Sequence, residues 1–362
     1  MFQRKNILVC PLDWGIGHAT RCIPIIQHLT EMDQNVIVAA DRAPLALLEK
    51  AFPKHEFIQF PGFAPVYSRG NSQIFSMAKQ SPLILHQIEK DHQNLEQFVK
   101  LHKLDAVISD NRFGAYSKQV HSVFMTHQLH IRLPSPVAWL THGIEKFNKH
   151  ILNNYNECWI PDFEDEINLS GELSHPPFHG IQTHYIGALS RLSNIQNSDK
   201  HSEFKPELLI LLSGPEPHRS LLENICLTQL TAIKIDTIIL RGLPEEKNIP
   251  KVPEHVKLFN HVSTAQIFKL IQAAKTIVAR SGYSTIMDLV AMGKTAVLIP
   301  TPGQTEQEYL ASLLESKGLF KKMNQQDANL NDVLKHTSEK VDFLPYKKTL
   351  LEKHLRHWLQ KL

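Results

Sequence analysis

Short apolar, β-branched runs alternate with longer amphipathic segments along this chain, and the alternation starts afresh in the second half. Strands separated by helices imply βαβ crossovers and a parallel sheet covered on both faces. In the first half the runs predict strands at Asn6–Cys10, Asn35–Ala40, Glu56–Phe60, Asp105–Asp110, Ser122–Thr126 and Cys158–Pro161. In the second half they predict strands at Leu208–Leu212, Thr237–Arg241, Val256–Phe259, Thr276–Ala279 and Ala296–Ile299. The sequence therefore predicts an α/β protein with two Rossmann-like domains.

The amphipathic segments predict helices at Ala19–Glu31, Pro44–Phe52, Ser76–His102, Pro136–Tyr155, Ser220–Thr231, Thr264–Ala274, Ser284–Met292 and Glu306–Ser316. Polar stretches at 162–184 and 193–205 are typical of a linker region. We expect a first domain at 1–185, a second at 186–345, and a basic C-terminal helix at 346–362 for which packing back on the first domain is one option. Two parallel sheets that face one another across a cleft would bring their ligand-binding loops to one site.

The composition excludes several classes of function. A net charge of +3 over 362 residues is too mild for a nucleic-acid-binding protein, though it is compatible with weak attraction to anionic lipid or phosphate. The four cysteines lack CxxC spacing, which favours buried, reduced thiols. Without a spanning apolar stretch or a signal peptide, we expect a cytoplasmic protein, with peripheral contact at the inner face of a membrane as an option. His127 and His130 form an H-x-x-H pair without an obvious third ligand, so we predict no metal site.

The segment Asp13–His18 links the first predicted strand to the first predicted helix. Gly15 and Gly17 permit close approach of a ligand, and amides at a helix start favour anionic or oxygen-rich groups. The third glycine of the dinucleotide fingerprint is absent, because Arg21 stands near its place. His18 feels the positive end of the helix dipole, which favours a neutral imidazole that can accept a proton. A histidine that only satisfies the turn is the alternative.

Asp110 ends a predicted strand, so its carboxylate is expected at the same rim as His18. There it could orient the imidazole or the acceptor, and the alternative is an ordinary helix N-cap. Asn111, Arg112 and His127 also lie at strand ends and are weaker candidates.

Two further turns join a strand to a helix in the second half. Ser213 and Gly214 form the first, where backbone amides could bind a phosphate and Arg219 could add positive charge, unless this is an ordinary βα turn. The second turn offers a glycine and hydroxyl residues at a helix start, a combination that favours anions. Its candidate residues are Arg280, Ser281, Gly282 and Ser284.

Asp288 lies one turn further along the same predicted helix, where a carboxylate suits the two hydroxyls of a ribose. A solvated surface acid is the alternative. After the next predicted strand, Glu306 and Gln307 carry groups suited to sugar hydroxyls, unless Thr305 and Glu308 simply form a capping box.

Together these segments resemble glycosyltransferase family 28 over most of the chain. The G-x-G-H loop with Arg21 three residues on is similar to the family's N-terminal glycine loop, and RSGYSTIMDLVAMGKTAVLIPTPGQTEQEYLA is similar to its donor-binding region. The resemblance implies a GT-B fold with an acceptor-side first domain, a UDP-sugar donor held by the second, and an inverting transfer that needs no metal or other cofactor. It also implies individual roles: Asp288 binds the ribose, Gln307 and Glu308 contact the donor sugar, Arg280–Gly282 form the nucleotide turn, and His18 is the base.

The chain also departs from the family pattern. The first loop reads Asp-Trp-Gly-Ile-Gly, SGPEPHR replaces a Gly-rich loop, and Asp288 stands where Glu is usual. The family's best-known member glycosylates a lipid-linked peptidoglycan precursor, which suggests a role in cell-envelope glycans, but the acceptor here stays open between a sugar, a lipid-linked and a small-molecule hydroxyl. We expect the transferred sugar to be a hexose or an N-acetylhexosamine. The segment 61–82, which contains several aromatic residues, is a candidate acceptor wall, membrane-facing patch or plain surface loop.

Three other functions are compatible with this sequence. A nucleotide-sugar hydrolase would use water as its acceptor, and one such family also carries a G-x-G-H-x-x-R loop. A UDP-sugar 2-epimerase shares the GT-B architecture and would interconvert sugars without transfer. A sensor would bind the nucleotide sugar without any turnover.

Overall fold

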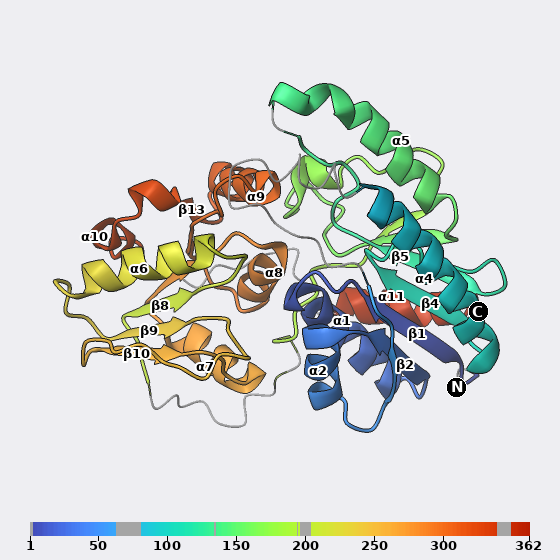
Figure 1. The fold of residues 1–362 in the computed structure, drawn as a ribbon, viewed down its shortest axis with the longest axis horizontal. Helices are drawn as coiled ribbons and strands as arrows, with labels where there is room; N and C mark the ends of the chain where they lie inside the picture. The colour runs from blue at the N-terminus through green and yellow to red at the C-terminus, as the bar shows by residue number, and fades with distance from the viewer. Residues whose placement is uncertain (1–2, 63–80, 134, 194, 196–203, 339–348) are drawn as a thin grey trace. The chain divides into compact units, whose positions relative to one another are not determined.

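The computed structural model describes residues 3–62, 81–133, 135–193, 195, 204–338 and 349–362. Its contacts divide the chain into two compact units. The first contains the described residues up to 190 together with 349–362, and the second contains those from 191 to 338. Helices surround a parallel sheet in each unit (Figure 1), as the alternating pattern predicts.

The first unit holds a seven-stranded parallel sheet, in the order β3-β2-β1-β4-β5-β6-β7 among its described residues. The strands are β1 (Asn6–Pro11), β2 (Asn35–Ala40), β3 (Glu56–Gln59), β4 (Ala106–Asp110), β5 (His121–Met125), β6 (Glu157–Ile160) and β7 (Thr183–Tyr185). The central strands β1 and β4 are buried almost throughout, which explains why they read as continuous apolar runs rather than alternating ones. All six strands predicted in this half are confirmed.

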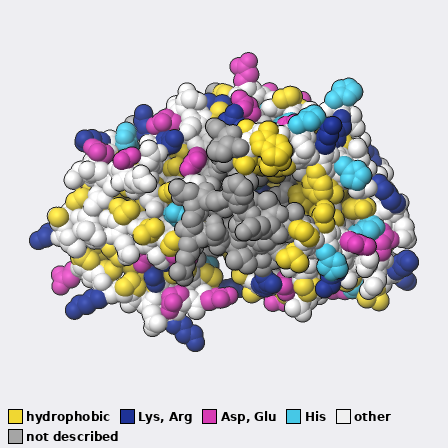
Figure 2. Space-filling view, turned by 45° about the horizontal axis from the view of Figure 1, so that its top comes forward, with side chains coloured by type: hydrophobic (Ala, Val, Ile, Leu, Met, Phe, Trp, Pro, Cys, Tyr) yellow, Lys and Arg dark blue, Asp and Glu magenta, His cyan; other side chains and the backbone are white. Residues whose placement is uncertain are grey.

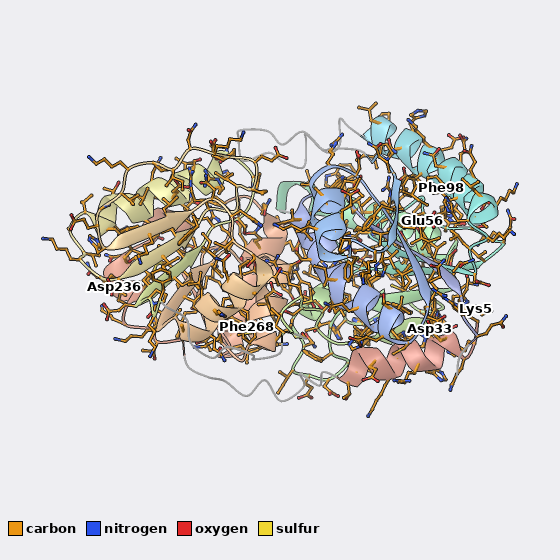
Figure 3. All side chains as sticks on the ribbon, turned by 90° about the horizontal axis from the view of Figure 1, so that it is seen from below. Lys5, Asp33, Glu56, Phe98, Asp236 and Phe268 are labelled. Atoms are coloured by element: carbon orange, nitrogen blue, oxygen red, sulfur yellow. The ribbon has the colours of Figure 1, made fainter. Side chains whose placement is uncertain are left out.

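Helices cover both faces of this sheet. They are α1 (Ile16–Glu31), α2 (Arg42–Ala51), α4 (Ser81–Leu101), α5 (Thr141–Leu152) and α11 (Thr349–Leu359). From α4, Leu95 and Val99 pack with Leu8 of β1 in one core cluster, and Phe98 meets Phe60 edge-on with ring centroids 5.2 Å apart. Figure 3 shows Phe98 on α4 at one face of the sheet and α11 at the other.

The C-terminal helix α11 packs against the first unit. Its Trp358 meets Trp159 of β6 edge-on at 5.1 Å between ring centroids, and both side chains are fully buried. The prediction of a helix near the C-terminus is confirmed, because Leu351, Leu355 and Leu359 form a buried stripe at helical spacing.

The interpretation of 162–184 as a linker is wrong in part. Thr183 and His184 belong to β7, the edge strand of the first sheet, and the fully buried Asp162 accepts hydrogen bonds from the backbone of Phe163, Leu169 and Ser170. A polar loop held by one buried carboxylate has the composition of a linker but is an ordered part of the first unit.

The second unit holds a six-stranded parallel sheet, in the order β10-β9-β8-β11-β12-β13 among its described residues. The strands are β8 (Leu208–Leu211), β9 (Thr237–Leu240), β10 (Val256–Phe259), β11 (Thr276–Ala279), β12 (Val297–Leu298) and β13 (Lys321–Lys322). The helices are α6 (His218–Leu230), α7 (Thr264–Ala273), α8 (Tyr283–Ala291), α9 (Thr305–Ser316) and α10 (Leu330–Val333). The sequence missed β13, because two lysines at a sheet edge carry no apolar run.

The four cysteines are buried and form no disulfide, as predicted. On the face drawn in Figure 2, the basic and acidic side chains of the described residues are interspersed rather than gathered by sign.

Candidate functional site

The first unit has a topological switch point between β1 and β4. The chain leaves β1 toward β2 on one side, while β4 lies on the other side, so the loops after these two strands diverge and leave a crevice at their carboxyl ends. Pro11 at the end of β1 is in register with Asp110 at the end of β4, and the backbone N–H of Leu12 donates to the carbonyl of Asp110 at 3.0 Å. Gly15 then opens α1 with a φ of 96°, which favours glycine, and places His18 in the first turn.

At this point the buried Arg21 and Asp110 form one cluster with His18, whose side chain is 16% exposed. Nδ1 of His18 lies 3.1 Å from Oδ2 of Asp110. Arg21 binds the same carboxylate through two nitrogens: Nε donates to Oδ2 at 2.8 Å, and Nη2 donates to Oδ1. Nη2 of Arg21 also lies 2.8 Å from Nδ1 of His18. The imidazole nitrogen therefore has one neighbour that only accepts and one that only donates, so the tautomer of the ring depends on which of them it bonds.

The electrostatics of the cluster follow from burial and the three charges. Burial alone raises the pKa of Asp110, but the charges of Arg21 and His18 and their hydrogen bonds lower it to about 2. Burial lowers the pKa of His18 from its ordinary 6.5, and the charge of Arg21 lowers it further against the opposing effect of Asp110. Burial and the charge of Arg21 therefore both favour the neutral imidazole, the form that the helix dipole also favours.

The weaker candidates near this cluster take different places. His127 is buried, and its Nδ1 lies 3.2 Å from Nη1 of Arg21, so it lines the same cluster. Arg112 instead binds Asp91 of α4 at 2.8 Å and the carbonyl of Phe60 at 2.8 Å. It joins α4 to the end of β3, a structural role. Asn111 adopts a φ of 57° immediately after β4, a backbone conformation that asparagine tolerates better than most residues.

In the second unit the switch point lies between β8 and β11. The turn Ser213–Gly214 follows β8, with a φ of 96° at Gly214, and a Cβ there would lie 3.3 Å from Oγ1 of Thr301. Ser281 and Gly282 follow β11 and lead into α8. Gly282 occupies the N-cap position of α8, so no side chain caps the first turn of this helix. Both predicted anion-receptive turns thus end neighbouring strands of one sheet.

The arginines at these turns are buried and hydrogen-bonded to other protein groups. Arg280 is fully buried and donates to the carbonyls of Ile299, Pro300 and His218 and to Oε1 of Gln325. Arg219 is also buried, and it donates to Glu216 at 2.7 Å and to Glu223 at 2.5 Å. Arg280 therefore holds three loops together beneath the turn, and the charge of Arg219 is balanced by two carboxylates.

The predicted sugar-contacting residues hold the turn that precedes α9. Oε1 of Gln307 accepts from the backbone N–H of Thr301 at 2.9 Å, and Oε1 of Glu308 accepts from that of Gly303 at 2.9 Å. Ser281 Oγ donates to the carbonyl of Gln307 at 2.8 Å, which ties α9 to the turn after β11. Gln304 rather than Thr305 occupies the N-cap position, so a Thr305–Glu308 capping box does not explain these residues.

Comparison with known proteins identifies this architecture. Residues 243–353 match the glycosyltransferase family 28 C-terminal domain, a stretch that contains the turn after β11, α8 and α9. The chain therefore carries a region similar to the C-terminal domain of glycosyltransferase family 28. An uncharacterized glycosyltransferase of Methanosarcina acetivorans is 21% identical over 315 residues, which cover 84% of this chain and 82% of that protein. The UDP-N-acetylglucosamine–N-acetylmuramyl-(pentapeptide) pyrophosphoryl-undecaprenol N-acetylglucosamine transferase of Sulfurihydrogenibium sp. is 23% identical over 191 residues, covering 51% of this chain and 53% of that enzyme.

Solved glycosyltransferase structures share the whole fold of this chain. The glycotransferase of kitacinnamycin superposes with a TM-score of 0.63 at 13% identity, covering 99% of this chain and 96% of that one. MurG of Acinetobacter baumannii superposes with a TM-score of 0.56 at 13% identity, covering 99% and 100%. The predicted two-domain GT-B fold is therefore confirmed. The family model and the curated relatives, rather than these distant structures, support a glycosyltransferase.

One residue of the candidate site was not predicted. Arg21 was noted only as part of the loop pattern, although its spacing of three residues from His18 already places both on one face of α1. Asp288 of α8 has a partner that no local sequence pattern predicts: its Oδ2 lies 3.7 Å from Nε of Arg191, at the start of the second unit. The roles of the predicted residues stay predictions.

Some expectations fall outside what the structure describes. The candidate acceptor segment 61–82 lies largely in 63–80, which is outside the described residues. Among the residues that are described, no helix has the length and apolarity to cross a membrane, and no three His, Cys, Asp or Glu side chains are grouped to hold a metal ion. Of the H-x-x-H pair, His127 faces Arg21 while Nδ1 of His130 lies 2.9 Å from Glu145.

Proposed function

We propose that this glycosyltransferase moves a hexose or N-acetylhexosamine from a UDP-sugar to a hydroxyl of its acceptor, with inversion and without a metal. The observation that carries the proposal is the contact of His18 with Asp110 at the switch point of the first sheet. A neutral imidazole next to an ionised, fully buried carboxylate is the arrangement that a general base requires. The chain's similarity to transferases named for UDP-N-acetylglucosamine supports the choice of donor.

The proposed chemistry is a single in-line displacement. The acceptor oxygen forms a bond to the anomeric carbon while the bond from that carbon to the phosphate oxygen breaks, and its proton passes to Nε2 of His18. For Nε2 to accept, the neutral ring must carry its proton on Nδ1, and Asp110 is the acceptor that stabilises this tautomer. The negative charge of Asp110 then stabilises the imidazolium that forms.

The leaving UDP needs compensation for its developing charge. In the proposal, backbone amides supply it from the turn Ser213–Gly214 and from the first turn of α8 after Ser281 and Gly282. Asp288 accepts the ribose hydroxyls, and Nε of Arg191 lies 3.7 Å from its Oδ2. Gln307 holds the adjacent turn through Oε1, and its Nε2 donates to Gln304. Glu308 holds the turn through Oε1, and in the proposal its second carboxylate oxygen contacts the sugar.

The acceptor and the cellular location are proposed only by class. The acceptor is a sugar, lipid-linked or small-molecule hydroxyl, and the lipid-linked substrates named for two relatives favour a role in cell-envelope glycans at the cytoplasmic face of a membrane. Sedimentation of the protein with anionic lipid vesicles tests the membrane part of this proposal.

The deciding experiment measures UDP release from UDP-N-acetylglucosamine, UDP-glucose and UDP-galactose, with and without an acceptor mixture and with EDTA. Acceptor-dependent release that EDTA leaves intact, with a product of inverted anomeric configuration by NMR, is the expected result. Equal release without acceptor indicates a hydrolase, a changed sugar without UDP release indicates an epimerase, and a thermal shift without turnover at any pH indicates a sensor. Each of these three results rejects the transferase assignment.

A further inference from the structure

Arg21 contacts every polar group of the His18 cluster. It binds both oxygens of Asp110, it lies 2.8 Å from Nδ1 of His18, and its Nη1 lies 3.2 Å from Nδ1 of His127. Its side chain is only 3% exposed and that of Asp110 is 0% exposed. A guanidinium that binds a buried carboxylate through two nitrogens fixes the orientation of the carboxylate as well as its charge.

We propose that Arg21 is the positioning residue of the His18–Asp110 pair, and that it sets the protonation of His18 while fixing the carboxylate that orients the ring. The proposal rests on the base role proposed for His18. In this proposal Arg21 does not contact a substrate and acts only through Asp110 and His18.

The geometry gives Arg21 two effects on His18. By holding Oδ1 and Oδ2 of Asp110, it keeps one oxygen 3.1 Å from the ring nitrogen. By placing a positive charge 2.8 Å from the same nitrogen, it opposes the imidazolium and competes with Asp110 for Nδ1. The charged and titratable groups that face His18 are Arg21 on its own helix, Asp110 from β4 and His127 from the loop after β5.

Two substitutions separate the charge of Arg21 from its hydrogen bonds. Arg21→Gln removes the charge but keeps an amide donor for Asp110. Arg21→Lys keeps the charge but loses the bidentate contact with the two oxygens of Asp110. The readout is an NMR pH titration of the His18 ring in the full-length, histidine-labelled protein, with its signal assigned by its loss in His18→Gln. This readout needs no acceptor and no turnover, so it fails or succeeds independently of the proposed transferase activity.

We expect His18 in wild-type protein to titrate below pH 6.5. Arg21→Gln should raise the midpoint by about one pH unit, because the charge that opposes protonation is lost while Asp110 still favours it. Arg21→Lys should leave the midpoint within a few tenths of the wild-type value. In a UDP-release assay both variants should turn over more slowly, and the acid limb of the pH–rate profile should move upward only in Arg21→Gln.

A matched control comes from a second buried arginine–aspartate pair in the same unit. Arg112→Gln breaks the contact with Asp91, a pair as buried as that of Arg21 with Asp110. Arg112 is not among the groups that shift the pKa of His18, so this substitution should leave the titration of His18 unchanged. A purely structural role for Arg21 predicts that Arg21→Gln behaves like Arg112→Gln, with lower stability and an unmoved His18 midpoint, and that result overturns the proposal. If Arg21→Gln fails to fold, the titration of His18 in Arg21→Lys still tests the proposal. A His18 midpoint that rises by a pH unit in spite of the retained charge contradicts the proposal.

Discussion

Nε of Arg191 lies 3.7 Å from Oδ2 of Asp288, although 97 positions of sequence separate them and neither belongs to a strand. Both side chains are largely buried, with 12% and 14% exposed. The acid proposed to bind ribose therefore lies beside a cation at the very start of the second unit.

Asp288→Asn should weaken the binding of UDP by roughly tenfold or more, because an amide cannot accept two hydroxyl hydrogen bonds through both of its terminal atoms. Isothermal titration calorimetry with UDP measures the loss. Asp332→Asn is the control, since Asp332 is exposed and pairs only with Lys335 among the interactions of the described residues, and it should bind UDP like the wild type. Unchanged UDP affinity in Asp288→Asn would remove the ribose role.

His18→Gln should lower kcat/KM by roughly a hundredfold or more while leaving UDP affinity unchanged, because general base catalysis typically contributes a factor of that order. The pH dependence provides a second check. Since burial and Arg21 lower the pKa of His18 from 6.5, the wild-type rate should decline on the acid side with a midpoint below pH 6.5, as the base becomes protonated. A midpoint above pH 7 would exclude His18 as the base.

Gly114→Ala should lower the free energy of unfolding by about 1–3 kcal/mol, the usual cost of forcing an extra methyl group into a packed site. A Cβ at this position would lie 2.1 Å from the carbonyl oxygen of Ile88 and 2.8 Å from Cβ of Asp91, both on α4, so backbone must move. Gly143→Ala in α5 is the matched control: nothing lies within 4 Å of its added Cβ, and alanine favours the helix by up to about 1 kcal/mol. Urea unfolding compares the two, and equal stabilities would contradict the crowding at Gly114.

Acidification should destabilise the protein through His354 of α11. Burial and the charge of His184 lower the pKa of this histidine from 6.5 to about 4. Below pH 6.5 His354 binds a proton in the unfolded chain but stays neutral in the folded chain. Its contribution to the free energy of unfolding is therefore fully present above pH 6.5 and is lost progressively down to about pH 4. His354→Phe, which keeps a ring against Trp159, should reduce the loss between pH 7 and pH 5 by on the order of 2 kcal/mol in urea unfolding. A loss identical to that of the wild type would show that other groups cause it.

Much of the fold could be predicted because its signals are local. Fully buried strands such as β1 and β4 read as short apolar runs, and the turns after β8 and β11 carry the glycine and hydroxyl residues of a strand-to-helix turn. The exceptions were elements without apolar runs: β7, hidden in a polar loop anchored by Asp162, and β13, a pair of edge lysines.

The candidate site could be predicted only in part. His18 and Asp110 were identifiable because each ends or follows a strand, and the carboxyl ends of parallel strands share one edge. Arg21, which contacts both of them, could not be identified as a partner, because no rule of spacing connects it with a carboxylate 89 residues away. Likewise, Arg280 and Arg219 suggest anion binding in the sequence, and only their buried hydrogen bonds show what already occupies them.

The sequence by itself determined two α/β units, the strand ends that carry polar residues, and the family 28 pattern of the second half, because these depend on the order of neighbouring residues along the chain. The tertiary structure decided which of those residues meet. Strand order places β4 beside β1 rather than beside β3, its nearest preceding strand in the chain, and that pairing alone brings Asp110 to His18 and Arg21. The charges that tune the imidazole therefore arise from a register between distant strands and from burial, and neither is encoded at any single position.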